Sequence, residues 1–216
     1  MKFWPWLKGA LLALAIIGYP VAMHVLLTHP QWPAITLAMG LLPLAIVVLG
    51  LLKAGQLKFA LLFIALLAVL IDNFWSTLLQ RRDLIYLIQN ASLDAMLAWI
   101  FARTLLPPHE ALISQFAKRI HGADFTPAMA TYTRQVTWAW ALFFVAIAMI
   151  SVLLFFTAPL SVWSFFVNVL PLPLLAAMFI AEYAARRYCL RDVQHVSIIK
   201  GASMFWETRA PADNQS

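Results

Sequence analysis

The sequence is poor in charge and has a single cysteine. Charged residues make up 11% of the chain, whereas 63% of its residues are hydrophobic and its mean hydropathy is +0.84. Soluble domains are typically about 45–50% apolar and about 25% charged. The composition therefore excludes a soluble globular protein and indicates an integral membrane protein. Because Cys189 has no second cysteine to pair with, a disulfide within the chain is impossible and the redox compartment stays open.

The sequence also lacks the short motifs of common enzyme classes. No G-x-S-x-G, H-E-x-x-H, C-x-x-C or phosphate-binding glycine loop occurs, so hydrolase, metalloprotease, redox and nucleotide-binding functions have no support. We therefore expect no metal and no cofactor, and we favour a protein without enzymatic activity. The net charge of +6 does not indicate a nucleic-acid partner, because the basic residues lie at the ends of apolar segments.

Long apolar segments predict an all-α membrane domain over residues 1–191, followed by a polar cytoplasmic tail over residues 192–216. Each segment is long enough to cross the hydrocarbon core, which takes a helix of about 20 residues. Pro171 and Pro173 predict a bend in the last segment, since proline removes a helical hydrogen bond. The six predicted spans are residues 7–28, 33–52, 58–79, 83–106, 134–156 and 160–184.

Residues 108–121, between the fourth and fifth spans, predict an amphipathic helix that lies on the membrane surface. Pro108 can begin this helix, since proline is favoured in a first turn. Leu112, Phe116 and Ile120 recur at helical spacing on one face, opposite charged side chains.

The basic residues predict the orientation in the membrane. Six spans place both termini on the same side, and every Lys and Arg except Arg81 and Arg82 falls on that side. Loops rich in Lys and Arg stay in the cytoplasm. We therefore expect a bacterial inner-membrane protein whose two termini are both cytoplasmic.

Polar residues inside the predicted spans form a candidate ligand-binding site. Asp94 lies near the middle of the fourth span, where a carboxyl costs roughly 2.5–3.5 kcal/mol. Tyr86 and Asn90 precede it at four-residue spacing, which places all three on one helical stripe. The candidate residues are His24, Asp72, Asn73, Asn90, Asp94 and Asn168. They can hold a headgroup, an ion or a proton, or they can simply bond one another and fix the helix packing.

A second polar cluster is expected at the cytoplasmic face. Arg134, near the start of the fifth span, and Glu182, near the end of the sixth, occupy matching depths and can pair. An ion pair that tethers adjacent helix ends is the simpler interpretation. Capture of a phosphate by Arg134 together with Arg186 and Arg187 is the alternative.

Polar and aromatic residues follow a pattern that is spread over most of the chain. They are Tyr19-Pro20, Asp72, Asn90, the run YTRQVT at 132–137, Trp140, Phe143, Phe144, Trp163, Asn168, Glu182, Arg186 and Arg187. The pattern resembles an uncharacterised six-span family of bacterial inner-membrane proteins, associated with gene clusters for aryl-polyene or xanthomonadin-type lipids. The chain departs from that family at Ala181, where the family tends to have glycine, and in a longer tail after Arg191.

The resemblance implies an envelope-lipid context, with carrier proteins, ketosynthases, acyltransferases and lipid exporters encoded nearby, and it implies no activity. We therefore predict a non-enzymatic accessory protein for assembly or transfer of an acyl or aryl-polyene-type lipid. Its surface helix and basic tail would dock acyl-carrier or acyltransferase partners. One alternative is a small proton-coupled transporter that uses Asp72 or Asp94. Others are a structural scaffold subunit and a membrane-embedded acyltransferase with His24 or His109 as its base.

Overall fold

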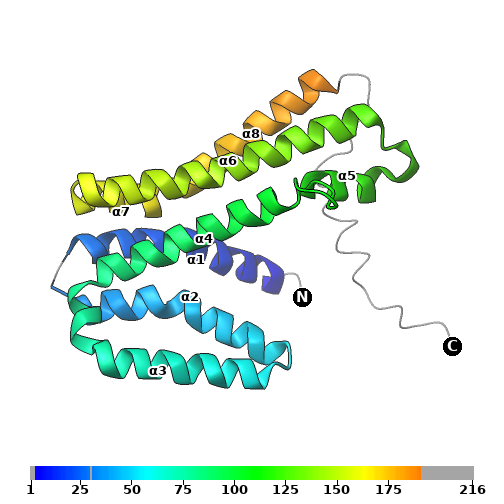
Figure 1. Ribbon diagram of the computed structural model, residues 1–216. Coiled ribbons are helices and arrows are strands. Elements are labelled where there is room, and N and C mark those ends of the chain that lie inside the picture. Colours follow the sequence, from blue (N-terminus) through cyan, green and yellow to red (C-terminus); the bar gives the residue numbers. More distant parts are fainter. Residues whose placement is uncertain (1–2, 30, 191–216) are drawn as a thin grey trace. The chain divides into compact units, whose positions relative to one another are not determined.

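The computed structural model describes residues 3–29 and 31–190, and every regular element in these ranges is helical (Figure 1). This confirms the all-α prediction for the described part of the chain. The predicted tail over residues 192–216 lies outside that part. In chain order the elements are α1 (Phe3–Thr28), α2 (Pro33–Lys53), α3 (Leu57–Gln80), α4 (Arg82–Arg103), α5 (Leu112–His121), the 3-10 helix η1 (Gly122–Asp124), α6 (Pro127–Thr157), α7 (Leu160–Asn168) and α8 (Pro171–Cys189).

Several of these helices are long and apolar enough to cross a membrane. They are α2, α3, α4 and α6, and the pair α7 and α8 is a fifth candidate when it is taken as one bent span. Within α1 the apolar stretch Ala13–Thr28 is shorter than a full span. The described residues therefore contain four or five candidate spans, as expected of a membrane protein.

The prolines of the last predicted span divide it into two helices. α7 ends at Asn168 and α8 begins at Pro171, with a bend of 46° between them. A residue that precedes proline is disfavoured in the helical conformation, whereas proline itself suits the first turn of a new helix. The predicted bend is confirmed, although two helices stand where one bent span over residues 160–184 was expected.

Helix α5 begins later than the sequence suggested. It starts at Leu112, and residues 104–109 form turns and bends, so Pro108 does not begin the helix. The backbone N–H of Leu112 donates to the Thr104 hydroxyl at 3.0 Å, which satisfies one of the free donors of the first helical turn. Gly122, with a φ of 54°, ends α5, because this left-handed conformation is easily adopted by glycine.

The helices form two compact units. Of the described residues, those up to 94 and those from 147 to 175 form unit 1, and those from 95 to 146 and from 176 to 190 form unit 2, so α4, α6 and α8 contribute to both. In unit 1, α1 packs against α2 and α7, and α2 packs against α3 (Figure 1). The buried core of unit 1 is Met23, Leu27, Tyr86, Leu87, Trp163 and Val167.

Unit 2 is built around an aromatic core. The Trp140 ring is buried, and its centroid lies 4.8 Å from that of Phe179 on α8 and 6.1 Å from that of Phe101 on α4. Helix α5 is held to α6 by hydroxyl groups, since the Ser114 and Thr133 oxygens lie 2.6 Å apart and both side chains are buried. The N–H of α5 residue Ile113 also donates to the Thr137 hydroxyl at 3.2 Å.

Candidate functional site

A chain of hydrogen bonds connects three helices inside unit 1. His24 Nδ1 on α1 and Ser164 Oγ on α7 lie 3.0 Å apart. Asn168 Nδ2, one turn further along α7, donates to the Ser164 carbonyl at 2.9 Å and to its hydroxyl at 3.3 Å. The Tyr86 hydroxyl on α4 then donates to Asn168 Oδ1 at 2.6 Å. The structure thus brings the predicted residues His24 and Asn168 together through Ser164.

Burial explains why these groups bond one another. Tyr86, Ser164 and Asn168 are all buried, and Ser164 is 0% exposed. A polar group without a partner in an apolar interior costs several kcal/mol. The spacing of four residues between Ser164 and Asn168 places both on one face of α7, where they meet His24 and Tyr86. The resulting network ties α1, α4 and α7 together.

The polar stripe of α4 extends this network. Asn90 lies one turn after Tyr86 and donates from Nδ2 to the Tyr86 carbonyl at 2.9 Å. Asp94 follows after another turn; it is half-buried, and it forms no hydrogen bond or ion pair with any residue that the structure describes. We define the polar seam as His24, Tyr86, Asn90, Asp94, Ser164 and Asn168. Its α7 end is saturated with hydrogen bonds, whereas its Asp94 end retains free acceptors.

Two predicted residues lie apart from the polar seam. Asp72 and Asn73 are exposed side chains on α3. Asn73 Nδ2 donates at 2.8 Å to the carbonyl of Val69, which belongs to the same helix. Four of the six predicted ligand-binding residues are therefore in the seam, and two are on the exposed surface of α3.

Ser164 is a member of the seam that the sequence analysis missed. Its position one turn before Asn168 was the available signal, because residues at this spacing share a helical face. A serine beside a histidine is also the pairing that nucleophilic catalysis uses. Here the Ser164 hydroxyl is fully buried and shared between His24 and Asn168, so a substrate carbonyl has no access to it. The His24–Ser164 pair therefore acts in helix packing.

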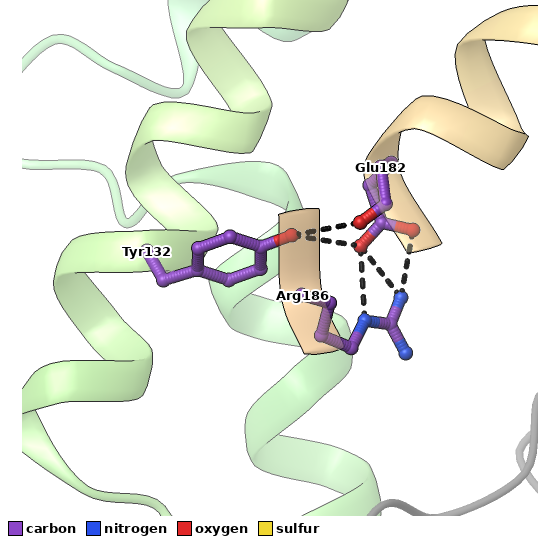
Figure 2. A network of polar contacts seen from close by, with 3 residues as sticks. All are labelled: Tyr132, Glu182 and Arg186. Carbon is purple, nitrogen blue, oxygen red and sulfur yellow. Dashed lines mark hydrogen bonds and ion pairs between the residues drawn. The ribbon is translucent and has the colours of Figure 1, made fainter. Parts of the chain in front are cut away.

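Unit 2 contains a second polar network, formed by Tyr132, Glu182 and Arg186 (Figure 2). Arg186 donates from Nη2 to both Glu182 oxygens at 2.7 and 2.9 Å, and from Nε to Oε1 at 3.0 Å. The Tyr132 hydroxyl donates to the Glu182 backbone carbonyl at 3.0 Å. The Glu182 side chain is only 9% exposed, compared with 33% for Arg186. The forked pairing lies within α8, and the Tyr132 hydroxyl is the group that joins this end of α8 to α6.

The pairing expected between Arg134 and Glu182 does not form. Arg134 is exposed, and its Nη2 donates at 3.0 Å to the carbonyl of Leu105, which follows α4. Glu182 instead takes Arg186, which lies one turn away on the same helix and is therefore always within reach. Arg187 is exposed. The guanidinium groups of Arg134 and Arg186 are thus both engaged by oxygen atoms of the protein itself.

Among the described residues, no group of three or more His, Cys, Asp or Glu side chains is arranged to hold a metal ion. Comparison with protein-family models, curated proteins and solved structures found no match to this chain. Three features of the chain therefore bear on its function: the polar seam, the network of unit 2 and the residue pattern of the sequence.

Proposed function

We propose that the protein is a non-enzymatic accessory protein of the bacterial inner membrane, which assists the assembly or transfer of an acyl lipid of the aryl-polyene type. The observation that carries this proposal is the polar seam. It runs from saturated, buried hydrogen bonds at Asn168 to a half-buried, unpaired carboxyl at Asp94. Asp94 is therefore available to a polar headgroup, while the rest of the seam holds the helices in place.

The residue pattern supplies the lipid context. Tyr132, Glu182 and Arg186, which belong to that pattern, meet in the network of unit 2 (Figure 2). Trp163 and Asn168 belong to it as well and lie in the buried interior of unit 1. The contacts among these residues give the pattern a structural role in this chain, and the lipid class is carried over from the resemblance.

The proposed topology has six spans, with both termini in the cytoplasm. It requires α1 as the first span and the α7–α8 pair as the last. Helix α5 would lie at the cytoplasmic surface, where Phe116 is exposed beside the exposed residues Lys118 and Arg119. An acyl-carrier or acyltransferase partner with an acidic surface would dock on this helix and on the basic tail.

The break between α7 and α8 favours a second candidate function, a small proton-coupled transporter. Transporters often bind their substrates at interrupted helices, whose free backbone groups face the ligand. Asn168 ends α7 at the break and also belongs to the polar seam. Asp94 belongs to the same seam, and in this function its carboxyl would take up the coupled proton. Transport driven by a pH gradient in proteoliposomes, and lost in Asp94→Asn, would select this function over the accessory one.

The accessory function is tested by an untargeted lipid profile. A deletion strain is compared with strains that carry the wild-type gene, Asp94→Asn or Asp83→Asn. Asp83, in the first turn of the same helix, is the matched control. We expect a specific loss of an acyl or aryl-polyene lipid on deletion, restoration by wild type and by Asp83→Asn, and a reduced output with Asp94→Asn. An unchanged profile in the deletion strain would refute the accessory function, and full output with Asp94→Asn would refute its headgroup role.

A further inference from the structure

Unit 1 contains a pocket between α1, α2 and α4 that the sequence analysis did not anticipate. Its unfilled space is about 210 Å³, part of which is open to the outside. The room available to the centre of a water molecule is about 10 Å³, which corresponds to one oxygen-sized group. Two polar residues of α4, Arg82 and Gln89, line it, so we call it the Arg82–Gln89 pocket.

Gln89 has a buried amide with no partner. Both its Nε2 and its Oε1 are buried, and neither forms a hydrogen bond with any residue that the structure describes. The Thr36 and Tyr86 hydroxyls, which also line the pocket, already donate to Leu26 and Asn168. A buried amide left without hydrogen bonds destabilises a protein by several kcal/mol. The pocket must therefore supply Gln89 with a polar group from another molecule.

Arg82 lines the same pocket from the N-terminal end of α4. It is the first residue of α4, and its Nη1 donates to the Leu79 carbonyl at 3.1 Å, so the rest of the guanidinium is free to bind an anion. Arg81 beside it is also basic, and Asp83 is the nearby acidic residue. The formal charges of Arg81, Arg82 and Asp83 thus sum to +1. Gln89 lies seven residues further along α4, about 10 Å deeper by the helical rise.

The order of chemistry along the pocket matches that of a phospholipid. Arg82 lies at the helix end, where the headgroups of a bilayer are found. The Gln89 amide comes next, and the walls are apolar, with Met23, Leu27 and Leu37. A phospholipid presents a phosphate, then an ester carbonyl, then hydrocarbon. The phosphate is too large for the narrow part of the pocket, whereas a single carbonyl oxygen fits it.

We infer that the Arg82–Gln89 pocket binds one anionic glycerophospholipid. Its phosphate accepts hydrogen bonds from Arg82 at the mouth, and one ester carbonyl accepts a hydrogen bond from the Gln89 amide inside. The acyl chain that carries this ester lies in the part of the pocket that is open to the outside. This site is separate from the lipid that the proposed function would transfer, and it would hold a lipid even if that function proved wrong.

The test uses the full-length protein, delipidated in a non-ionic detergent. Lipid retention is measured by native mass spectrometry and stabilisation by the melting temperature. Phosphatidylglycerol is added in one arm, phosphatidylcholine in a second and inorganic phosphate in a third. The variants are Arg82→Gln and Gln89→Leu, with Arg81→Gln as the matched control, because Arg81 is the exposed neighbour.

We expect phosphatidylglycerol to be retained more strongly than phosphatidylcholine, and inorganic phosphate to have little effect. Arg82→Gln and Gln89→Leu should each reduce retention about tenfold, because each removes a hydrogen bond to the lipid. Arg81→Gln should bind like wild type. Without lipid, Gln89→Leu should melt at a higher temperature than wild type, since it removes the unpaired amide.

Gly40 offers a steric test that leaves the polar groups intact. A Cβ atom at Gly40 would lie 3.9 Å from Met23 Cε and from Tyr86 Cδ2, which is ordinary contact, so Gly40→Ala should fold. It narrows the pocket and should weaken retention, and Gly40→Leu should abolish it.

Three outcomes would overturn the inference. One is equal retention by wild type and Gln89→Leu, even with a raised melting temperature, which would mean that a water molecule satisfies the amide. Another is stabilisation by inorganic phosphate as large as that by the lipid. The third is an equal loss in Arg81→Gln and Arg82→Gln, which would mean that general surface charge attracts the lipid.

Discussion

Units 1 and 2 use polar side chains in different ways. In unit 1, hydrogen bonds cross between helices, from His24 through Ser164 and Asn168 to Tyr86, and polar groups at Asp94 and Gln89 stay unpaired. In unit 2 hydrogen bonds also cross between helices, from Ser114 to Thr133 and from Tyr132 to Glu182, but its charged side chains are paired with one another, as in Glu182 with Arg186 and Glu110 with Lys118. Its core is aromatic instead.

This difference indicates where a ligand can bind. Paired charges near helix ends stabilise an arrangement and have little capacity left for another molecule. Unpaired polar groups inside an apolar bundle are costly, so Asp94 and Gln89 in unit 1 are the groups that retain capacity to bind a ligand. Unit 1 therefore contains both proposed ligand sites, whereas the stability of unit 2 rests on aromatic packing and on the pairing of Glu182 with Arg186.

Trp163→Ala should have the largest effect, and it tests whether unit 1 depends on its buried core. Trp163 is 0% exposed, packs against Tyr86 and Phe155, and donates from Nε1 to the Ser151 hydroxyl at 3.2 Å. Its removal should lower the free energy of unfolding by about 3–5 kcal/mol, measured by reversible unfolding in micelles. Trp75→Ala, at an exposed tryptophan of the same unit, should cost less than about 0.5 kcal/mol. Equal costs would contradict the assigned core.

Glu182→Gln should have the next largest effect and tests the network of unit 2. The change removes the charge that Arg186 pairs with, in a site where Glu182 is nearly buried. We expect a loss of about 1–2 kcal/mol in the free energy of unfolding, since hydrogen bonds between charged groups are stronger than neutral ones. Arg187→Gln, on the exposed side of the same turn, is the control and should be close to neutral. A stable Glu182→Gln variant would show that Tyr132 alone holds the end of α8.

A double-mutant cycle of Tyr86→Phe and Asn168→Ala measures the central bond of the polar seam. The Tyr86 hydroxyl and Asn168 Oδ1 lie 2.6 Å apart. Hydrogen bonds between membrane helices average about 0.6 kcal/mol, with a maximum of about 1.7 kcal/mol. We expect a coupling energy of about 1 kcal/mol from unfolding measurements on the two single variants and the double variant. Additive effects would mean that this bond does not hold α4 to α7.

The ion pair between Lys118 and Glu110 should have the smallest effect. Its atoms lie 2.6 Å apart, but both side chains are substantially exposed. Exposed ion pairs contribute about 0–1 kcal/mol and weaken as salt is added. We expect Glu110→Gln to cost less than about 0.5 kcal/mol in low salt and nothing measurable in high salt. A larger cost that persists in salt would mean that this pair is as well shielded from solvent as the pair of Glu182 and Arg186.

Helix positions could be predicted from the sequence because their signals are local. Pro33 begins α2 as expected, and Pro171 begins α8 directly after the break. The predicted start of α5 was wrong. The helix begins at Leu112, because the free N–H of Leu112 finds its acceptor in the hydroxyl of Thr104, eight residues earlier in the chain. No local pattern at Pro108 reveals that bond.

Helix faces were harder to predict than helix positions. A segment that is apolar on all sides gives little periodic signal, so the sequence could not show that Asp72 points away from its neighbours in unit 1 while Tyr86 is buried. Gln89 was missed for the same reason, since its unpaired amide becomes evident only when the lining of the pocket is known. Asn90 and Asp94 were found because they follow Tyr86 at four-residue spacing on one helical stripe, which Gln89 does not share.

Asn168 has two structural roles. It is the last residue of α7, and its Oδ1 accepts the hydrogen bond from the Tyr86 hydroxyl. The conformation of the break and the strength of the hydrogen bond to α4 are therefore thermodynamically linked. A ligand whose binding depends on the arrangement of the polar seam would therefore change its affinity when the conformation of the break is altered, for example by a substitution at Pro171. Through this one asparagine, the geometry of the break and the contact between α7 and α4 depend on each other.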